Sequence, residues 1–490
     1  MRNVLILLAS LTACGNDPSE PDSSGPPPTY YADAKAIIDA KCATCHEPGG
    51  IGPFPLTSYA EVEEFVGAMK SAIKNGTMPP WQPSDDCNSY EGNFDLTTEQ
   101  RTTLLAWLDA DAPAGDPADA PAAPTPTPEF EADIALVLPE PYTPVREPDD
   151  YRCQLIPWPG QETRFVTGLR VTPDQRSIVH HTIVFAVGPD QVAQYMAYDA
   201  AEAGPGYTCY GGPAANTGEG PFANVDRQEL LAALDRLGIS IIDLQTGNIT
   251  EAQLFTLMDE LGIKPALSSA LGSWVPGVAS QPMPAGVGIR IEPGSMLVVQ
   301  MHYNTQSSAP VADQSTIEIA TATAVEREAT LLGVVDLGWV TQGLIGEPMT
   351  IPAGEENVEH STSLAFDAPL VTRARDTLGL AADAPLVLHT ANHHMHELGR
   401  RQRTEVRHAD GTTTCVLDIP DWDFHWQGAY KLENPITLRA GDQLHMGCAW
   451  DNSAANQPIV DGEPREPAVV VWGEGTSDEM CLGGFFVTRE

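Results

Sequence analysis

Basic residues are scarce in this chain. There are 26 Lys and Arg against 67 Asp and Glu, which gives a formal net charge of −41. So acidic a protein, without a run of five or six basic residues, would repel nucleic acid, and we exclude a nucleic-acid partner. Long hydrophobic runs are also missing, because no apolar stretch of about 18 residues follows residue 13. We therefore expect no membrane-spanning helix.

The length and composition favour a folded protein of several domains. A chain of 490 residues has room for sizeable buried cores. Its 42% hydrophobic content is too high for a mainly disordered protein. The 43 prolines and 42 glycines favour loops and β-structure over long helices.

The first residues have the features of an export signal. Arg2 precedes a short apolar run, residues 4–8, and small residues then lead to Cys14. This order resembles a bacterial lipoprotein signal, in which residues 1–13 are removed and Cys14 is lipidated. An ordinary secretory signal with an incidental cysteine is the alternative, and both predict an oxidising compartment. Gly15 after the cysteine favours the outer membrane, with the protein facing the periplasm or the cell surface.

Residues 42–46 form a Cys-x-x-Cys-His motif. Cys42 and Cys45 can form thioethers with the vinyl groups of a haem, and His46 is placed to ligate the iron. Met78 lies in a loop that two following prolines hold extended, and it is the expected second axial ligand. The alternative is a redox dithiol or half of a zinc site. A zinc site lacks its second cysteine pair here, and a redox motif needs no trailing histidine.

Helical patterns surround this motif at residues 31–41, 58–75 and 97–108, the last with a capping-box start. Residues 29–112 therefore resemble a small cytochrome c domain. We expect a flexible tether at residues 14–28 and a Pro-rich linker at residues 113–129. This linker should keep the haem domain near the rest of the chain without fixing one position.

From about residue 130 the pattern changes to short alternating runs separated by Gly, Pro and Asp. These runs predict a β-sandwich, and they lie at residues 165–171, 177–187, 286–291, 295–304, 384–389 and 469–472. Residues 227–262 instead have the pattern of amphipathic helices and predict a helical insertion. Six cysteines remain besides Cys14 and the haem pair, an even number that suits disulfides in an exported protein.

Histidines gather in the strand-like runs. His394 and His396 are two residues apart, which places both imidazoles on one face of a strand, close enough to chelate one ion. His180 and His181 are adjacent and would point to opposite faces of a regular strand. If both bind one metal, the backbone must bulge there. A single strand histidine is more often a packed core residue than a ligand, so it is the clusters that favour a metal site.

At this point residues 130–490 resemble the type II copper monooxygenases, the family of peptidylglycine α-hydroxylating monooxygenase and dopamine β-monooxygenase. The similar stretches follow the same order along the chain: residues 150–153, residues 179–185 with His180-His181, residues 284–288, Gln300-Met301-His302-Tyr303, residues 349–354, residues 394–399 with His394-Met395-His396, and residues 475–481 with Glu479-Met480-Cys481. The resemblance implies two jelly-roll-like sandwiches, which we place at residues 130–310 and 311–490. The expected fold is mainly β, tandem jelly-roll-like β-sandwiches preceded by a small all-α cytochrome c domain.

The resemblance also implies two copper ions with different ligands. One falls on His180, His181 and His302, and in this family it stores and supplies an electron. The other falls on His394, His396 and Met480, and it binds O₂ and substrate. Two imidazoles and a thioether favour Cu(I), whereas three imidazoles alone could hold zinc.

Several neighbouring residues have lesser or open assignments. Met446 is the rival thioether to Met480, but its surroundings do not match the family motif. The resemblance implies the disulfides Cys153–Cys209 and Cys448–Cys481, and it leaves Cys87 and Cys415 unassigned. We interpret the remaining histidines of this region as structural or as supports of the ligands: His389, His393, His425 and His445.

Two departures from the family concern the substrate. The peptide-amidating members have an Arg two residues before the His-x-His motif and a Tyr four residues after the Met, and both contact the peptide. Here these positions are Asn392 and Gly484. Without the Arg a peptide carboxylate loses its charge-assisted anchor, which favours a neutral, apolar substrate.

Together these patterns predict an exported copper monooxygenase with its own haem c. It would hydroxylate a C–H bond of a small organic substrate with O₂, anchored to the membrane by lipid alone. Electrons would come from ascorbate or a respiratory redox partner, with the haem passing them to the copper at His180, His181 and His302, near which it should dock. The alternative is a non-catalytic copper and haem redox protein that keeps the fold, and an electron carrier with a docking sandwich is a third.

Overall fold

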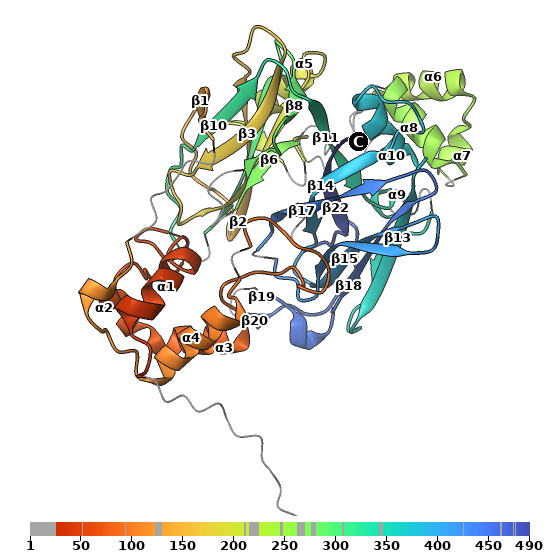
Figure 1. The fold of residues 1–490 in the computed structure, drawn as a ribbon. Coiled ribbons are helices and arrows are strands. Elements are labelled where there is room, and N and C mark those ends of the chain that lie inside the picture. The colour runs from red at the N-terminus through yellow and green to blue at the C-terminus, as the bar shows by residue number, and fades with distance from the viewer. Residues whose placement is uncertain are drawn as a thin grey trace, which may run out of the picture.

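The computed structural model describes residues 26–490 apart from residues 51, 94, 123–129, 210–211, 215–224, 246–247, 262–269, 276–280, 306–307, 342, 344–345, 425, 461–462, 474 and 476. The predicted signal, Cys14 and His425 therefore lie outside the described residues. The described chain is mainly β, with a group of helices at its N-terminal end (Figure 1). None of the helices within these ranges is long and apolar enough to cross a membrane.

The N-terminal helices form where the local sequence predicts them: η1 (Tyr30–Ala34), α1 (Lys35–Lys41), α2 (Tyr59–Glu64), α3 (Val66–Asn75) and α4 (Thr98–Asp109). Capping boxes begin α2 and α4, because Ser58 pairs with Glu61 and Thr97 pairs with Gln100. Phe65 interrupts the expected helix 58–75, since its backbone leaves helical values. Tyr30, Leu104 and Trp107 are fully buried in the core that these helices share. A short turn, η2 (Pro117–Asp119), follows.

The first sandwich packs a five-stranded sheet against part of a larger one. The five strands run in the order β5-β2-β9-β4-β6. Their bounds are β2 (Asp149–Pro157), β4 (Val179–Val187), β5 (Tyr207–Thr208), β6 (Ala270–Trp274) and β9 (Met296–Asn304). The opposing strands are β1 (Ile134–Val137), β3 (Arg164–Thr172), β7 (Gln281–Pro282), β8 (Val287–Ile291) and β10 (Thr316–Ala322). Apolar residues from both sheets form one core, as alternation predicts.

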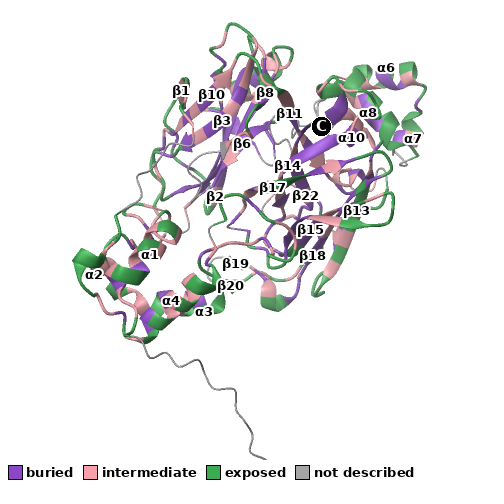
Figure 2. Ribbon diagram, viewed as in Figure 1, coloured by how far each residue is buried: buried purple, intermediate pink, exposed green. Residues whose placement is uncertain are grey.

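The second sandwich is built in the same way. A four-stranded sheet, β13-β18-β15-β16, lies against strands β11, β22, β14 and β17. The four-stranded sheet contains β13 (Val358–Ala365), β15 (Gly399–Arg407), β16 (Thr413–Ile419) and β18 (Gln443–Trp450), and the opposing strands are β11 (Arg327–Val334), β14 (Leu386–His394), β17 (Ala429–Leu438) and β22 (Leu482–Arg489). Short pairs complete it: β12 (Thr350–Ile351) with β21 (Val470–Val471), and β19 (Ile459–Val460) with β20 (Glu463–Pro464). Burial is greatest between the layers (Figure 2).

One sheet connects the two sandwiches. β11 pairs with β8 in parallel and with β22 in antiparallel register, so a nine-stranded sheet runs through both. β10, which follows the expected division at residue 310, pairs with β3 and β1 in the first sandwich. The sandwiches are therefore joined by backbone hydrogen bonds and not only by a linker.

Helices outside the first domain cover the sandwiches. The expected insertion contains α6 (Arg227–Leu237), α7 (Ile241–Gln245) and α8 (Glu251–Glu260). Its apolar side packs on Leu337 of the second sandwich, and it lies at the periphery of the molecule (Figure 1). The other short helices are α5 (Val192–Ala201), α9 (Leu337–Val340), α10 (Pro369–Thr377) and η4 (Ala454–Asn456).

Candidate metal centres

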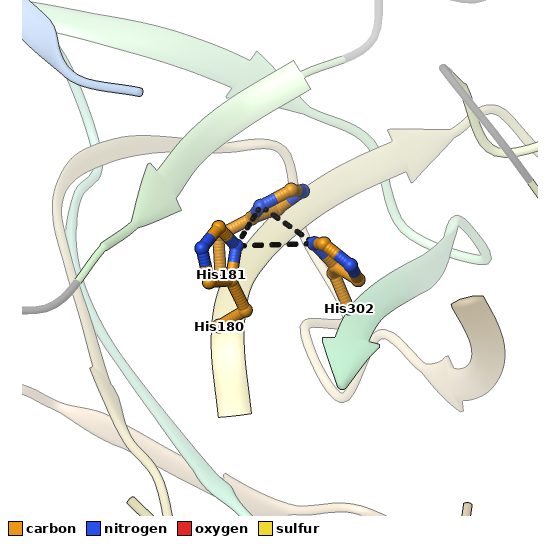
Figure 3. A group of neighbouring side chains, drawn as sticks. All are labelled: His180, His181 and His302. Carbon is orange, nitrogen blue, oxygen red and sulfur yellow. Dashed lines mark hydrogen bonds between the residues drawn. The ribbon is translucent and has the colours of Figure 1, made fainter. Parts of the chain in front are cut away.

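Two neighbouring strands bring three histidines together. His180 and His181 lie on β4, and His302 lies opposite them on β9 (Figure 3). The pairing shifts by one residue between Val179 and His181, which is the bulge that the adjacent histidines predict. Because of this bulge both side chains of β4 turn toward His302. All three imidazoles are buried.

The geometry of this group suits a metal ion. The Nδ1 atoms of His180 and His181 are 3.4 Å apart, and each lies 3.2 Å from Nδ1 of His302. A point equidistant from three nitrogens so placed lies about 1.9 Å from each, close to the roughly 2.0–2.1 Å of a bond between a divalent metal and imidazole. Among the described residues these three form a group whose ligand atoms lie within 4.8 Å of one another.

Asp149 orients one of the three imidazoles. Nε2 of His302 donates a hydrogen bond to Oδ1 of Asp149 at 2.8 Å, and Nδ2 of Asn304 donates to the same oxygen at 2.9 Å. Tyr151 stacks on the His302 ring, with centroids 4.0 Å apart and planes 7° apart. The proton is thus held on Nε2, so the lone pair of Nδ1 faces His180 and His181.

The surroundings of His181 favour its neutral form. Burial lowers the pKa of His181 well below its usual 6.5, and repulsion from His302, His180 and His394 lowers it further. His394 belongs to the second predicted site.

The second group begins at the end of β14. The rings of His394 and His396 lie with centroids 5.0 Å apart and planes at 81°. Nδ1 of His394 donates to Oε1 of Gln427 at 2.6 Å, and Nδ1 of His396 donates to the carbonyl of Asp478 at 3.0 Å. Each ring therefore has its Nε2 left to bind a metal. In the first group it is the Nδ1 atoms that converge. Burial lowers the pKa of His396 to about 3, so this imidazole is neutral at pH 7.

Glu479 joins this pair to the stretch that carries Met480. Its carboxylate is fully buried and accepts hydrogen bonds from the backbone amides of His396 at 2.9 Å and Leu398 at 2.6 Å, and from Nε1 of Trp450 at 2.9 Å. Burial raises the pKa of Glu479 to about 7. Met480, the next residue, is only 3% exposed. Glu479 thus fixes the loop of His396 against the chain at Met480.

The rival thioether is occupied elsewhere. Nε2 of Gln402 lies 3.2 Å from the sulfur of Met446, which is fully buried. A Cβ at Gly483 would lie 3.1 Å from the same sulfur. The sulfur of Met446 is therefore already in contact with the chain around it.

Three other histidines have hydrogen-bond partners of their own. His389 contacts Oγ1 of Thr488 and His393 contacts Oγ1 of Thr404, each at 2.9 Å. Nδ1 of His445 lies 2.8 Å from Oγ of Ser363. These contacts fit the structural roles expected for the three residues.

The Cys-x-x-Cys-His motif follows α1. Cys42 and Cys45 are not in a disulfide, and burial raises the pKa of their thiols to about 12 and about 11. Nδ1 of the buried His46 donates to the carbonyl of Phe54 at 2.8 Å, so Nε2 is the nitrogen that could bind a metal. Met78 is 42% exposed in the loop after α3.

The two departures from the family lie side by side. Asn392 on β14 pairs with Gly484 on β22. A Cβ at Gly484 would collide with the side-chain oxygen of Asn392. The amide of Asn392 thus fills the space over Gly484, and a large side chain at residue 484 would have to displace it.

Sequence reasoning missed two features of these sites. Asp149 stands one residue before the similar stretch at residues 150–153, and its place opposite Asn304 emerges only from the strand register. Cys87 forms a disulfide with Cys415, a pairing that the sequence left open. The implied disulfides Cys153–Cys209 and Cys448–Cys481 are both present.

Comparison with known proteins adds a family to the second sandwich. Residues 345–487 match the family model for the copper type II ascorbate-dependent monooxygenase, C-terminal domain. His394, His396 and Met480 all lie within this range. No match was found among curated proteins.

Two solved structures show distant likeness. A structure of PNGF-II has 10% identity and a TM-score of 0.22, with 73% of this chain and 65% of the PNGF-II chain covered, so less than two thirds of that chain is spanned. The major capsid protein P2 from bacteriophage PM2 has 10% identity and a TM-score of 0.18, with 70% and 97% covered. At these scores neither likeness supports an argument. The informative match is that residues 345–487 are similar to the C-terminal domain of a copper monooxygenase family.

Proposed function

We propose that this protein is a copper-dependent monooxygenase that hydroxylates a C–H bond of a small organic substrate with O₂. The observation that carries the proposal is the convergence of His180, His181 and His302 at metal-binding distances. The second support is the pair His394 and His396, which lies within the part that matches the copper monooxygenase family. Copper at two such sets would supply one-electron redox chemistry and O₂ chemistry at a C–H bond, with the second oxygen atom leaving as water.

The chain's own residues prepare these sets in three ways. Burial lowers the pKa of His181 and of His396, so that these imidazoles are neutral at pH 7 and ready to donate lone pairs. Asp149 holds the proton of His302 on Nε2, away from the converging Nδ1 atoms. Glu479, the residue before Met480, accepts a hydrogen bond from the backbone amide of His396 and so holds the two segments together. His394, His396 and Met480 act as the second set of ligands.

The pair Asn392 and Gly484 supports a substrate that is neutral and apolar. The positions that bind a peptide in the amidating enzymes hold an amide in contact with a bare backbone here. Neither position offers a cationic side chain that could pair with a carboxylate. A small molecule without a carboxylate therefore fits this chain better than a peptide.

Electrons are proposed to pass through a haem c at Cys42, Cys45 and His46, with Met78 as the second axial ligand. The orientation of His46 and the unpaired state of both thiols support this assignment. Ascorbate, the donor in the family name, is the other source. We further propose an exported, lipid-anchored protein of the outer membrane, with Cys14 as the anchor, which agrees with three disulfides.

Metal analysis followed by product analysis tests this function. The purified holoprotein should contain two coppers and one haem. Given reductant and O₂ with a panel of neutral small molecules, it should yield a product heavier by one oxygen atom, and ¹⁸O₂ should supply that atom. His394→Ala, which removes one ligand of the second set, should abolish the product and keep the haem.

The same experiment separates the alternative. Two bound coppers with no oxygenated product under any reductant would favour a non-catalytic redox protein. One copper, or zinc in preference to copper, would refute the assignment of two copper sites.

A further inference from the structure

The chain after Met78 anchors the helical domain on the second sandwich. Residues 81–91, which we call the docking segment, exchange backbone hydrogen bonds with β17 and with the end of β16. The amide of Glu91 donates to the carbonyl of Lys431, that of Glu433 to Ser89, and that of Ser84 to Asp418. Figure 1 shows this orange segment reaching from the helical domain to the blue strands.

A disulfide and buried aromatic rings fix the docking segment. Cys87 is bonded to Cys415 on β16. Tyr90 is 4% exposed and its hydroxyl donates to the carbonyl of Val416 at 2.9 Å. Trp81 meets Tyr430 of β17 edge to face at 5.3 Å. The expectation that the Pro-rich linker leaves the position of the helical domain open is therefore wrong. A disulfide and a packed interface at the docking segment fix this domain on the second sandwich.

The helical domain meets the first sandwich through the loop of the haem motif. Glu47, directly after His46, forms an ion pair with Arg176. Arg176 stands four residues before His180.

The loop that carries Arg176 is itself rigidly held. The amide of Gln175 donates to Oδ1 of the fully buried Asp313 at 2.9 Å, and that of Asp174 lies 3.3 Å from Oγ of Ser315. The carbonyl of Gln175 accepts from the amide of Val179, the residue before His180. The path from Arg176 to the histidine group thus runs through ordered backbone.

We propose that the docking segment and the Glu47–Arg176 ion pair hold the haem motif against the loop before His180, so that electrons reach the monooxygenase part at the group of His180, His181 and His302. This inference rests on the proposed function, since it requires haem and copper. With haem and copper bound, the step would move one electron: haem iron would go from ferrous to ferric, copper held by the three histidines would go from Cu(II) to Cu(I), and no atom would be transferred. A one-electron carrier protein would reduce the haem again.

The structure offers one competing route, which the test must separate. Trp81 touches Tyr430, and Tyr430 pairs with Ala391, three residues before His394. Electrons on that route would reach the second histidine group first. We favour the first route because the loop that contacts the first sandwich contains the cysteines and the histidine that would bind the haem. The second route starts near Met78, which is 42% exposed.

Flash photoreduction of the holoprotein separates the two routes. A limiting pulse of one-electron reductant reduces the haem, and its re-oxidation is followed by absorbance, with loss of the Cu(II) signal followed by electron paramagnetic resonance. Wild-type protein should re-oxidise its haem faster than copper-free protein. His302→Ala should reduce the fast phase to the copper-free rate, and His394→Ala should retain it.

Charge exchange tests the contact. Arg176→Glu should slow haem re-oxidation about fivefold, the effect of losing an ion pair at the stronger end of the exposed range. The exchange Glu47→Arg with Arg176→Glu should restore the rate to within about twofold. The matched control is Arg236→Glu, which breaks the exposed Arg236–Glu260 pair of the helical insertion and should leave the rate unchanged.

The outcomes distinguish a failure of this inference from a failure of the proposed function. If copper does not accelerate haem re-oxidation in the wild-type protein, the haem is not the donor and that part of the proposed function fails. If copper accelerates it but His394→Ala, and not His302→Ala, removes the fast phase, the function stands and the route is wrong. An unchanged rate in Arg176→Glu would overturn the role of the ion pair.

Discussion

Asp149→Ala is expected to weaken copper binding at the first histidine group alone. The side chain of Asp149 accepts from Nε2 of His302 at 2.8 Å and is itself held by Asn304 at 2.9 Å. Loss of such a support typically lowers metal affinity about 10–100-fold, which is about 1.4–2.7 kcal/mol. The size is reasonable, because a hydrogen bond to a charged group contributes about 1.5–3 kcal/mol.

Two further variants sharpen this prediction. Asp149→Asn can still accept a hydrogen bond but has no charge, so its loss should lie near the lower end of the same range. Glu318→Gln is the matched control, since Glu318 pairs with Arg170 on the outer sheet of the same sandwich. It should leave copper affinity unchanged.

Competition titration with a Cu(I) chelator measures both sites in one sample. The site at His394 and His396 serves as the internal reference, because Asp149 accepts its hydrogen bond from His302, a residue of the first group. Equal weakening of both sites would indicate a global change and not a local one. Unaltered affinity at the first site would refute the idea that Asp149 sets the tautomer of His302.

Three other substitutions test separate parts of the structure. Met480→Leu keeps the side-chain volume and should remove sulfur from the Cu(I) X-ray absorption spectrum, whereas Met446→Leu should not; the reverse result would make Met446 the ligand. Gly484→Ala should lower the free energy of unfolding by about 1–2 kcal/mol because of its collision with Asn392, and Asn392→Ser should recover most of this loss in denaturant titrations; equal losses with either residue at 392 would refute the collision. The double variant Cys87→Ser and Cys415→Ser should lose about 2–5 kcal/mol of stability and slow haem re-oxidation, while an unchanged rate would mean that the remaining contacts suffice to place the helical domain.

The sequence predicted those features that depend on neighbours in the chain. The helices of the first domain follow from periodicity and caps, and Thr97 with Gln100 forms the expected capping box. A bulge at His180 was expected on the condition that both adjacent histidines bind one metal, and the strand pairing does shift there. These features need only local geometry, in which side chains alternate along a strand and recur every turn of a helix.

Features that depend on distant pairing were beyond such reasoning. Cys87 and Cys415 are 328 residues apart, and nothing in their local sequences distinguishes them as partners. β8 and β11 pair in parallel across the expected border of the sandwiches, and β10 pairs back with β3. Asp149 acts through a strand 153 residues away. Register between strands decides all of these, and alternation fixes which face a residue occupies but not which residue lies opposite it.

The pH dependence of folding provides a last test, with a sign that the buried histidines determine. His389 is 4% exposed, and burial lowers its pKa to about 4. Between pH 6.5 and 4 the unfolded chain binds a proton at this histidine and the folded chain does not, so stability falls as pH falls through this window. For a shift of this size the loss between pH 7.5 and pH 5 is about 2 kcal/mol.

Glu479 acts in the opposite direction, because burial raises its pKa to about 7 and the folded chain then holds a proton that the unfolded chain has lost. A variant at His389 therefore isolates the contribution of this residue better than the pH dependence of the wild-type unfolding free energy does. His389→Gln keeps a polar group near Thr488 and should make the copper-free protein about 2 kcal/mol less sensitive to the change from pH 7.5 to pH 5. Urea unfolding of both proteins at the two pH values measures the difference. If the variant and the wild type lose the same free energy, His389 already carries a proton in the folded protein at pH 5, and its burial does not depress its basicity as the structure requires.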